Sequence, residues 1–250
     1  DIRGVALEGI EGESVNLTTE VTTALAQAFV AWLGEKNGKT AQIIAVGSDS
    51  RLSSPTLRQA FADGAAAAGA TVLNFGMAST PAMFMATVDE QLHADGAVMV
   101  TASHLPWNRN GLKFFTAKGG LEKADIACIL ELAPQFMGSE TEGNGEVKAV
   151  DFMATYCDIL ANYIRRGVNN GDQPLQGMHI IVDAGNGAGG FFANKVLKSL
   201  GADTTGSQFL EPDGHFPNHI PNPENKEAMA SICKAVVEHK ADLGIIFDTD

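Results

Sequence analysis

The chain has 250 residues, of which 45% are hydrophobic and 19% charged, and its formal net charge is −13 at pH 7. This composition is typical of a globular protein large enough for one large domain or two ordinary ones. The negative charge argues against nucleic acid as the main partner, because binding to a phosphate backbone needs a cationic surface, and no apolar run reaches the ~18 residues that a membrane helix requires.

No signal peptide opens the chain, which begins at Asp1 rather than Met, so we expect the natural N-terminus to be missing. We expect an intracellular protein, in the cytoplasm or the plastid stroma, and the chain decides neither the compartment nor the oligomeric state. Its three cysteines, Cys128, Cys157 and Cys233, are far apart and odd in number, which fits neither a disulfide framework nor a zinc knuckle. We expect them to be buried, reduced thiols.

Strand and helix signals alternate in the first half. Short apolar runs predict buried strands at residues 41–46, 71–75 and 96–100. Helical spacing, with Pro55 and Pro81 near helix starts, predicts helices at residues 21–33, 55–68 and 81–87. Gly69 stands where a helix usually ends in a left-handed residue.

The pattern starts again after the polar, glycine-rich stretch 138–145, which predicts a linker. Further helices are predicted at residues 151–165 and 191–200, and strands at residues 178–182 and 242–247. The first of these helices places five apolar or aromatic residues on one face: Phe152, Tyr156, Ile159, Leu160 and Tyr163. The sequence therefore predicts two consecutive layered α/β domains, at residues 1–143 and 144–250.

The two halves form a weak internal repeat. Each has a strand, a Gly-containing loop and a helix closed by Gly-Ala, followed by a later strand that ends in reactive side chains. The first half delivers Ser103 and His104, and the second delivers Asp248 and Asp250. Because ligands of such sheets bind beyond the carboxyl ends of the strands, two facing domains would bring a serine opposite a pair of carboxylates.

Asp248 and Asp250 follow a buried strand and alternate at i and i+2. Carboxylate oxygens suit a hard cation such as Mg²⁺, and a third ligand would have to come from outside this chain. The alternative is a solvated strand end, where Asp is common.

Ser103 and His104 do not fit a serine hydrolase, which sets its nucleophile in G-x-S-x-G and brings its histidine from elsewhere in the chain. On an extended segment the two side chains would point to opposite faces, so His104 is a poor base for Ser103. Pro106 and Trp107 would stiffen the loop, an Asn110-Gly111 turn would follow, and Lys113 adds a cation. A serine beside local positive charge indicates a phosphate site, and a hydroxyl that satisfies a loop amide is the alternative.

Gly185, Gly187 and Gly190 match the dinucleotide fingerprint G-x-G-x-x-G, with Glu211 as its acidic partner. Asp183 and Asn186 crowd the position of the pyrophosphate, so a tight strand–helix junction is the alternative reading.

Two further stretches carry weaker signals. The loop 212–224 has four prolines that forbid a regular helix, so the spacing of His215 and His219 does not predict a metal site. In the segment 47–55, Ser53 or Ser54 precedes Pro55 as a helix N-cap, and Asp49 with Arg51 suggests a local ion pair.

These stretches together resemble the α-D-phosphohexomutase superfamily, which contains phosphoglucomutases, phosphomannomutases and phosphoglucosamine mutases. Seven motifs are in register along nearly the whole chain: DIRG, GSDSRLSSP, GMASTP, TASHLPWNRNGLK, VDAGNGAGG, PDGHFPNH and the terminal DTD. Two positions depart from the family pattern. Ser48 stands where arginine is usual, and Leu105 stands in place of asparagine.

The resemblance implies a four-domain, Mg²⁺-dependent mutase that moves a phosphoryl group within a hexose phosphate through a hexose bisphosphate. Ser103 would carry the phosphoryl group, and its phosphate would share Mg²⁺ with Asp248 and Asp250. Arg3, His104 and Lys113 would surround the phosphate and the sugar hydroxyl. This chain would hold the first domain and most of the second.

Three other functions remain open from the residues. One is an NAD-dependent oxidoreductase built on Gly185–Gly190, and another is a dehalogenase-type phosphatase with Asp248 as nucleophile. The third is a non-catalytic relative that binds sugar phosphates, supported only by Ser48 and Leu105.

Overall fold

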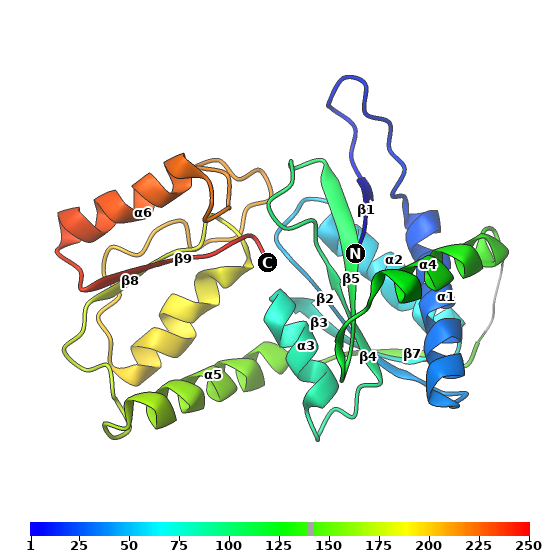
Figure 1. Cartoon of the computed structure of the whole chain (residues 1–250), viewed down its shortest axis with the longest axis horizontal. Coiled ribbons are helices and arrows are strands. Elements are labelled where there is room, and N and C mark those ends of the chain that lie inside the picture. Colours follow the sequence, from blue (N-terminus) through cyan, green and yellow to red (C-terminus); the bar gives the residue numbers. More distant parts are fainter. Residues whose placement is uncertain (140–142) are drawn as a thin grey trace. The chain divides into compact units, whose positions relative to one another are not determined.

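The computed structural model describes residues 1–139 and 143–250 (Figure 1). The chain divides into two compact units, Asp1–Asp151 and Phe152–Asp250, and each is described here by itself. Both units are layered α/β structures, as the alternation of strand and helix signals predicts. Among the described helices, none combines the length and the apolar character that crossing a membrane would require.

A mixed seven-stranded sheet forms the first unit, in the order β1-β5-β4-β2-β3-β7 with β6 beside β5. Its strands are β1 (Ile2–Val5), β2 (Ile43–Ser48), β3 (Thr71–Met77), β4 (Gly96–Val100), β5 (Arg109–Thr116), β6 (Gly119–Gly120) and β7 (Glu146–Ala149). Strands β4, β2, β3 and β7 are parallel, whereas β5 is antiparallel to both β4 and β1. The predicted strands β2, β3 and β4 are confirmed, and β1 and β5 were not expected from apolar runs.

Helices cover both faces of this sheet (Figure 1). They are α1 (Thr19–Asn37), α2 (Ser54–Ala67) and α4 (Lys123–Leu132) on one face, with the short 3-10 helix η1 (Ala133–Phe136), and α3 (Thr80–Val88) on the other. Successive side chains of β2 alternate between the two faces. Ile44 and Val46 enter the main core with Phe29, whereas a Cβ on Gly47 would come within 2.7 Å of Met83 Sδ on α3.

The predicted linker at residues 138–145 is packed against the first unit at Gly143 and Gly145, rather than being a loose connection. Residues 140–142 lie outside the described residues. Gly143 donates a backbone hydrogen bond to the Ala67 carbonyl at 2.8 Å, and a Cβ on Gly145 would come within 2.3 Å of the Ala66 carbonyl oxygen. Strand β7 then pairs in parallel with β3, so residues 146–149 belong to the sheet of the first unit, whereas the sequence places the domain boundary between 143 and 144.

The second unit contains two parallel strands, β8 (Ile180–Asp183) and β9 (Leu243–Ile246), between helical layers. Its helices are α5 (Phe152–Val168), α6 (Lys226–His239) and the irregular run η2 (Ala188–Gly190), η3 (Phe192–Leu197) and η4 (Lys198–Leu200). Ile180 and Val182 pack toward α5 and η3, whereas Ile181 packs against Ile232 of α6. The helix predicted at 191–200 thus forms, but with π and 3-10 geometry rather than as a regular α-helix.

The internal repeat is visible at two helix ends. Gly69 and Gly201 have φ values of 90° and 89°, in the left-handed region that favours glycine. In both places the glycine N–H donates to the carbonyl three residues earlier, and the following Ala70 or Ala202 N–H donates to the carbonyl five residues earlier. Each half therefore closes its helix by the same stop.

Two expectations about burial need correction. Cys157 is buried, but Cys128 and Cys233 are exposed, and all three are free thiols. On α5 the buried side includes Phe152 and Tyr156, whereas Tyr163 is 58% exposed and stacks with the Arg166 guanidinium at 4.8 Å. A tyrosine ring can remain at the surface because its polar tip and a cation partner offset its apolar area.

Candidate functional site

The loop between β4 and β5 turns sharply at Ser103. Ser103 has φ 54°, and its backbone N–H donates to Thr101 Oγ1 at 2.9 Å. Its Oγ lies 3.3 Å from His104 Nδ1. The expectation that these two side chains point to opposite faces is therefore wrong, because it assumed an extended segment. Ser103 is 7% exposed and His104 is exposed.

A buried guanidinium holds this loop in place. Arg51 has no exposed surface, and its Nη1 donates to the carbonyls of Pro106 (2.8 Å) and Arg109 (3.0 Å). Its Nη2 donates to the Leu105 carbonyl at 2.6 Å and to the Ser103 carbonyl. The planar fork of an arginine suits this arrangement because one rigid group can satisfy several carbonyls at once.

Asp49 completes the anchor beneath the loop. Its Oδ2 lies 3.3 Å from Arg51 Nε and accepts a hydrogen bond from Thr101 Oγ1 at 2.7 Å, while its Oδ1 accepts one from Ser54 Oγ at 2.6 Å. Burial raises the pKa of Asp49, and the Arg51 charge and the hydroxyl hydrogen bonds from Ser54 and Thr101 oppose that shift. The ion pair that the sequence suggests is confirmed, and it anchors a loop more than fifty residues away in the sequence.

Arg3 and Lys113 come from neighbouring strands beside the loop. The register pairs Arg3 with Gly111, so Arg3 and Lys113, two residues further along β5, lie on the same face of the sheet. The backbone of Thr101 also reaches this place, because its N–H donates to the Gly111 carbonyl at 3.0 Å. Within the first unit, the structure thus brings two cations to the sheet edge from which the Ser103 loop departs.

The predicted Asn110-Gly111 turn is wrong, since both residues lie inside β5. A Cβ on Gly111 would come within 2.4 Å of the Ile2 carbonyl oxygen and 2.9 Å of the Thr101 carbonyl oxygen. Glycine is needed there because three segments approach closely. Asn110 is buried, and its Nδ2 donates to Ser53 Oγ at 2.8 Å. Ser53 is the N-cap residue of α2, as the sequence suggests, but its side chain makes no capping hydrogen bond and accepts from Asn110 instead.

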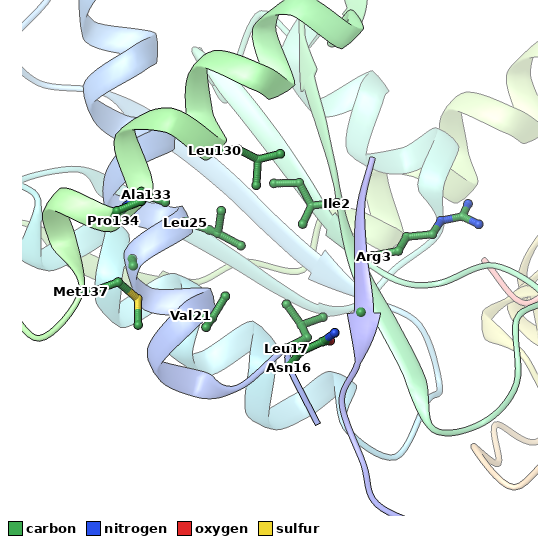
Figure 2. A pocket seen from close by; sticks show the side chains of 12 residues that line it. Ile2, Arg3, Asn16, Leu17, Val21, Leu25, Leu130, Ala133, Pro134 and Met137 are labelled. Carbon is green, nitrogen blue, oxygen red and sulfur yellow. The ribbon is translucent and has the colours of Figure 1, made fainter. Parts of the chain in front are cut away.

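An apolar pocket lies behind β1 (Figure 2). It has a volume of about 380 Å³, and its lining includes Ile2, Leu17, Leu25, Leu130 and Met137. In Figure 2 the Arg3 side chain extends to the opposite side of the strand from Ile2, as the alternation of a strand requires. The Arg3 guanidinium, 3.3 Å from Asp1 Oδ2, therefore points away from this pocket. Asn16 also lines the pocket, and its Oδ1 accepts the Val5 N–H at 2.8 Å.

Asp248 and Asp250 lie in the second unit, just after β9. Thr249 between them is fully buried, and its carbonyl accepts from the Ala188 N–H at 2.8 Å. Asp248 and Asp250 are half-buried, and Asp248 Oδ1 accepts the Thr249 N–H at 2.8 Å. Two oxygen-donor side chains on a held backbone fit Mg²⁺, but no described group of three or more His, Cys, Asp or Glu forms a complete metal site.

The glycine-rich loop after β8 is filled by its own chain. A Cβ on Gly187 would come within 2.6 Å of the Thr249 carbonyl oxygen, one on Gly189 within 2.8 Å of the Phe247 ring, and one on Gly190 within 2.1 Å of the Leu210 carbonyl oxygen. A dinucleotide fingerprint uses such glycines to let a pyrophosphate approach the backbone. Here neighbouring segments occupy those approaches, so the reading as a tight junction is favoured.

The histidines of the loop 212–224 have separate partners. His219 Nε2 lies 2.9 Å from Asp183 Oδ2, with the His219 side chain 5% exposed and that of Asp183 fully buried. His215 Nδ1 lies 2.8 Å from Asp213 Oδ1, and hydrogen bonds from His215 lower the pKa of Asp213. The backbone carbonyl of Glu211, rather than its carboxylate, accepts a hydrogen bond from Asn186 Nδ2. The contacts of His219 with Asp183 and of Asn186 with Glu211 hold the proline-rich loop against the end of β8.

Comparison with known families decides the assignment. The model of phosphoglucomutase/phosphomannomutase α/β/α domain I matches residues 1–133, and that of domain II matches residues 154–250. The chain belongs to the phosphoglucomutase/phosphomannomutase family.

Three bacterial members of this family are similar to the chain. A phosphomannomutase of Escherichia coli is 36% identical over the whole chain, which covers 52% of that relative. A phosphoglucomutase of Neisseria gonorrhoeae is 33% identical over 98% of the chain, which covers 50% of it. A solved family protein from Burkholderia thailandensis is 27% identical, with a TM-score of 0.78 over 99% of the chain and 52% of its own. The chain thus spans about half the length of the relatives it matches.

The two departures from the family pattern have structural consequences. The Leu105 carbonyl and N–H both hold the loop, through Arg51 Nη2 and the Ala102 carbonyl, so the change of side chain leaves these backbone contacts available. At Ser48, Arg58 Nη1 of α2 donates to Ser48 Oγ at 2.6 Å. A guanidinium therefore still lies against position 48, although it comes from the next helix. Nothing in the sequence pattern pointed to Arg58.

Proposed function

We propose that the protein containing this chain is a phosphohexomutase that interconverts hexose 1-phosphate and hexose 6-phosphate. In the first half-reaction the P–O bond to Ser103 Oγ breaks and a P–O bond to the sugar hydroxyl forms. The sugar hydroxyl loses its proton and the serine oxygen gains one, which leaves a hexose bisphosphate. In the second half-reaction the other phosphoryl group returns to Ser103, and the isomeric monophosphate is released.

The anchored Ser103 loop is the observation that carries this proposal. Phosphoryl transfer depends on positioning and charge neutralisation more than on covalent chemistry by the protein. Arg51 fixes four carbonyls of the segment around Ser103 through one buried group, so the backbone that carries Ser103 is held before any substrate arrives. Family membership supports the same reaction class.

Arg3 and Lys113 would stabilise the negative charge that develops on the transferring phosphoryl group. They share one face of neighbouring strands at the edge where the Ser103 loop begins. Preorganised cations of this kind act on the transition state without reorganisation, and such electrostatic effects are often the largest in catalysis. His104 would exchange a proton with the serine oxygen, and the 3.3 Å between its Nδ1 and Ser103 Oγ supports this role.

Asp248 and Asp250 would hold Mg²⁺ together with an oxygen of the Ser103 phosphate. The metal, when bound, would withdraw charge from the phosphoryl oxygens. Buried Thr249 and its hydrogen bond with Ala188 fix the backbone on which the two carboxylates stand.

The close packing of Gly187 and Gly190 argues against the NAD-dependent alternative. For the dehalogenase-type alternative, Asp248 would be the covalent phosphate carrier, so the residue that is phosphorylated separates it from our proposal. A non-catalytic relative would bind hexose phosphates without turnover.

Turnover by the full-length protein tests the proposal. Purified protein should interconvert glucose 1-phosphate or mannose 1-phosphate with the 6-phosphate in the presence of Mg²⁺, and activity should fall by several orders of magnitude in Ser103→Ala. An Asp248→Asn protein that keeps full activity would contradict the metal assignment. Binding of hexose phosphate without any turnover would favour the non-catalytic relative.

A further inference from the structure

Among the described residues, Arg58 is a cation without an acidic partner. It lies on α2 and is half-buried, and its one hydrogen bond among the described residues goes to Ser48 Oγ at 2.6 Å. Its Nε is buried and has no hydrogen-bond partner within the described chain. None of the ion pairs of the described residues includes Arg58, although the chain carries 30 acidic residues against 17 lysines and arginines.

A half-buried guanidinium without an acidic partner costs free energy unless an anion binds to it. Burial lowers the pKa of Arg58, because the charged form loses hydration, and no carboxylate of the described residues pairs with it. A buried donor without an acceptor likewise costs free energy. Such a group therefore marks a place where an anion would be stabilised.

The side chain of Arg58 lines a pocket at the carboxyl ends of β3 and β7. The pocket has a volume of about 600 Å³, and its lining includes Asn74, Gly76, Ala149 and Asp151. Ligands of parallel α/β sheets bind at this edge of the strands. The volume accommodates a phosphate group together with part of an attached small molecule.

Asn74 supplies a second donor to the same pocket. Its Oδ1 accepts the Gly76 N–H at 3.0 Å, and this bond fixes the orientation of the amide. The Nδ2 group is then the donor that the side chain can offer to a ligand. Within the described residues no acceptor bonds to Nδ2. Gly76 has φ 68°, and a Cβ built on it would meet no atom within 4 Å, so the space beside this turn is open.

We propose that Arg58 and Asn74 form a binding site for a small phosphate-type oxyanion, apart from the Ser103 loop. The guanidinium would pair with two anion oxygens, and the Asn74 amide would donate to a third or to one of the same pair. Asp151 also lines the pocket, and repulsion between its carboxylate and the anion limits the affinity. The site does not depend on mutase activity, because it shares no lining residue with the Ser103 loop.

Calorimetric titration of the full-length protein with inorganic phosphate, at ionic strength held constant with chloride, tests the site. The background is Lys113→Gln, which removes one of the two cations beside the Ser103 loop and so weakens phosphate binding there. A saturable phosphate site that depends on Arg58 is expected in this background. It should be lost in the added Arg58→Gln and weakened roughly ten-fold or more in Arg58→Lys, because lysine cannot pair with two oxygens.

Two further variants act as controls. Lys118→Gln removes an exposed positive charge elsewhere in the first unit and should leave phosphate affinity unchanged. Asp151→Asn should tighten binding severalfold, because it removes the opposing carboxylate. Thermal melting without phosphate checks that each variant is folded, and Arg58→Lys carries the test if Arg58→Gln does not fold. No saturable binding in the Lys113→Gln background, or equal binding with and without Arg58, would overturn the proposal.

Discussion

Two loops that follow buried strands, the Ser103 loop and the Gly185–Gly190 loop, are fixed by opposite means. In the first, a buried side chain reaches in from another element, as Arg51 donates to backbone carbonyls and Asp49 holds Arg51 and Thr101. In the second, the backbone itself fills the space, with Gly187 against Thr249 and Gly190 against Leu210.

The difference teaches how to interpret glycine and polar motifs in such folds. An anchor that bonds only to carbonyls leaves the side chains of the loop available for chemistry. Glycines that bring segments into van der Waals contact leave no approach for a ligand, even where their spacing matches a ligand-binding fingerprint. The carboxylates that the second unit offers lie instead on the segment that these glycines pack against, on either side of Thr249.

Removing the anchor of the first loop should have the largest effect. Arg51→Ala leaves four carbonyls and buried Asp49 without their partner, so we expect the free energy of unfolding to fall by about 3–5 kcal/mol. Urea denaturation of the full-length protein measures this. Arg51→Lys keeps the charge but not the fork and should be intermediate. A loss below about 1 kcal/mol for Arg51→Ala would mean that the loop is held by other contacts.

Adding a methyl group to the packed glycine loop should have the next largest effect. Gly190→Ala places a Cβ within 2.1 Å of the Leu210 carbonyl oxygen, and we expect a loss of about 1–3 kcal/mol in stability. Gly167→Ala, on α5, is the matched control, because a Cβ there meets no atom within 4 Å and alanine favours helix. Equal stability of the two variants in urea would refute the packing argument.

The sequence predicted the parts of the fold that depend on local patterns. Apolar runs located β2, β3 and β4, and glycines marked the two matching helix stops at Gly69 and Gly201. Strand β5 was missed because Asn110-Gly111 is a common turn pair. Only the close approach of Ile2 and Thr101, which is a tertiary contact, explains a glycine inside that strand.

The candidate site was predictable in its residue types but not in its support. Ser103, His104 and Lys113 stand out near one another in the sequence, and the family pattern adds Arg3. Arg51 bonds to the Ser103 loop across more than fifty positions of sequence, and only the packed fold brings the two together. The sequence shows just the short-range pair of Arg51 with Asp49. The turn at Ser103, with φ 54°, likewise depends on the contacts of that loop.

Changing the side chain at 105 should separate the anchor from substrate handling. Leu105→Asn keeps the backbone groups that bond to Arg51 and Ala102, so we expect a change in unfolding free energy within about 0.5 kcal/mol. Because the side chain neighbours Ser103 and His104, kcat/KM for hexose phosphates should change. Identical kinetics on glucose, mannose and glucosamine phosphates would contradict any role of this position in substrate handling.

A smaller, pH-dependent effect should come from the loop before α1. Hydrogen bonds from Arg109 (2.5 Å) and Asn108 (2.8 Å) lower the pKa of Glu13 below its ordinary value of 4.5. Ionised Glu13 therefore stabilises the folded state. This stabilisation is fully present above pH 4.5 and is lost as the pH falls through the lowered pKa that Glu13 has in the folded protein.

Melting temperatures of the wild type and Glu13→Gln test this at several pH values. The wild type should melt slightly higher at pH 7, and the difference should shrink as the pH falls below the ordinary range of a glutamate. A difference that stays constant with pH would show that the ionised carboxylate is not responsible.

Mapping of the phosphorylated residue tests the central claim most directly. The full-length protein is measured by intact mass and peptide mapping before and after phosphatase treatment, and again after reloading with a hexose bisphosphate. We predict that a single phosphate is lost and regained on Ser103, and that added hexose monophosphate removes it as the bisphosphate forms. A phosphate on Asp248, or none on any residue under turnover conditions, would contradict the account.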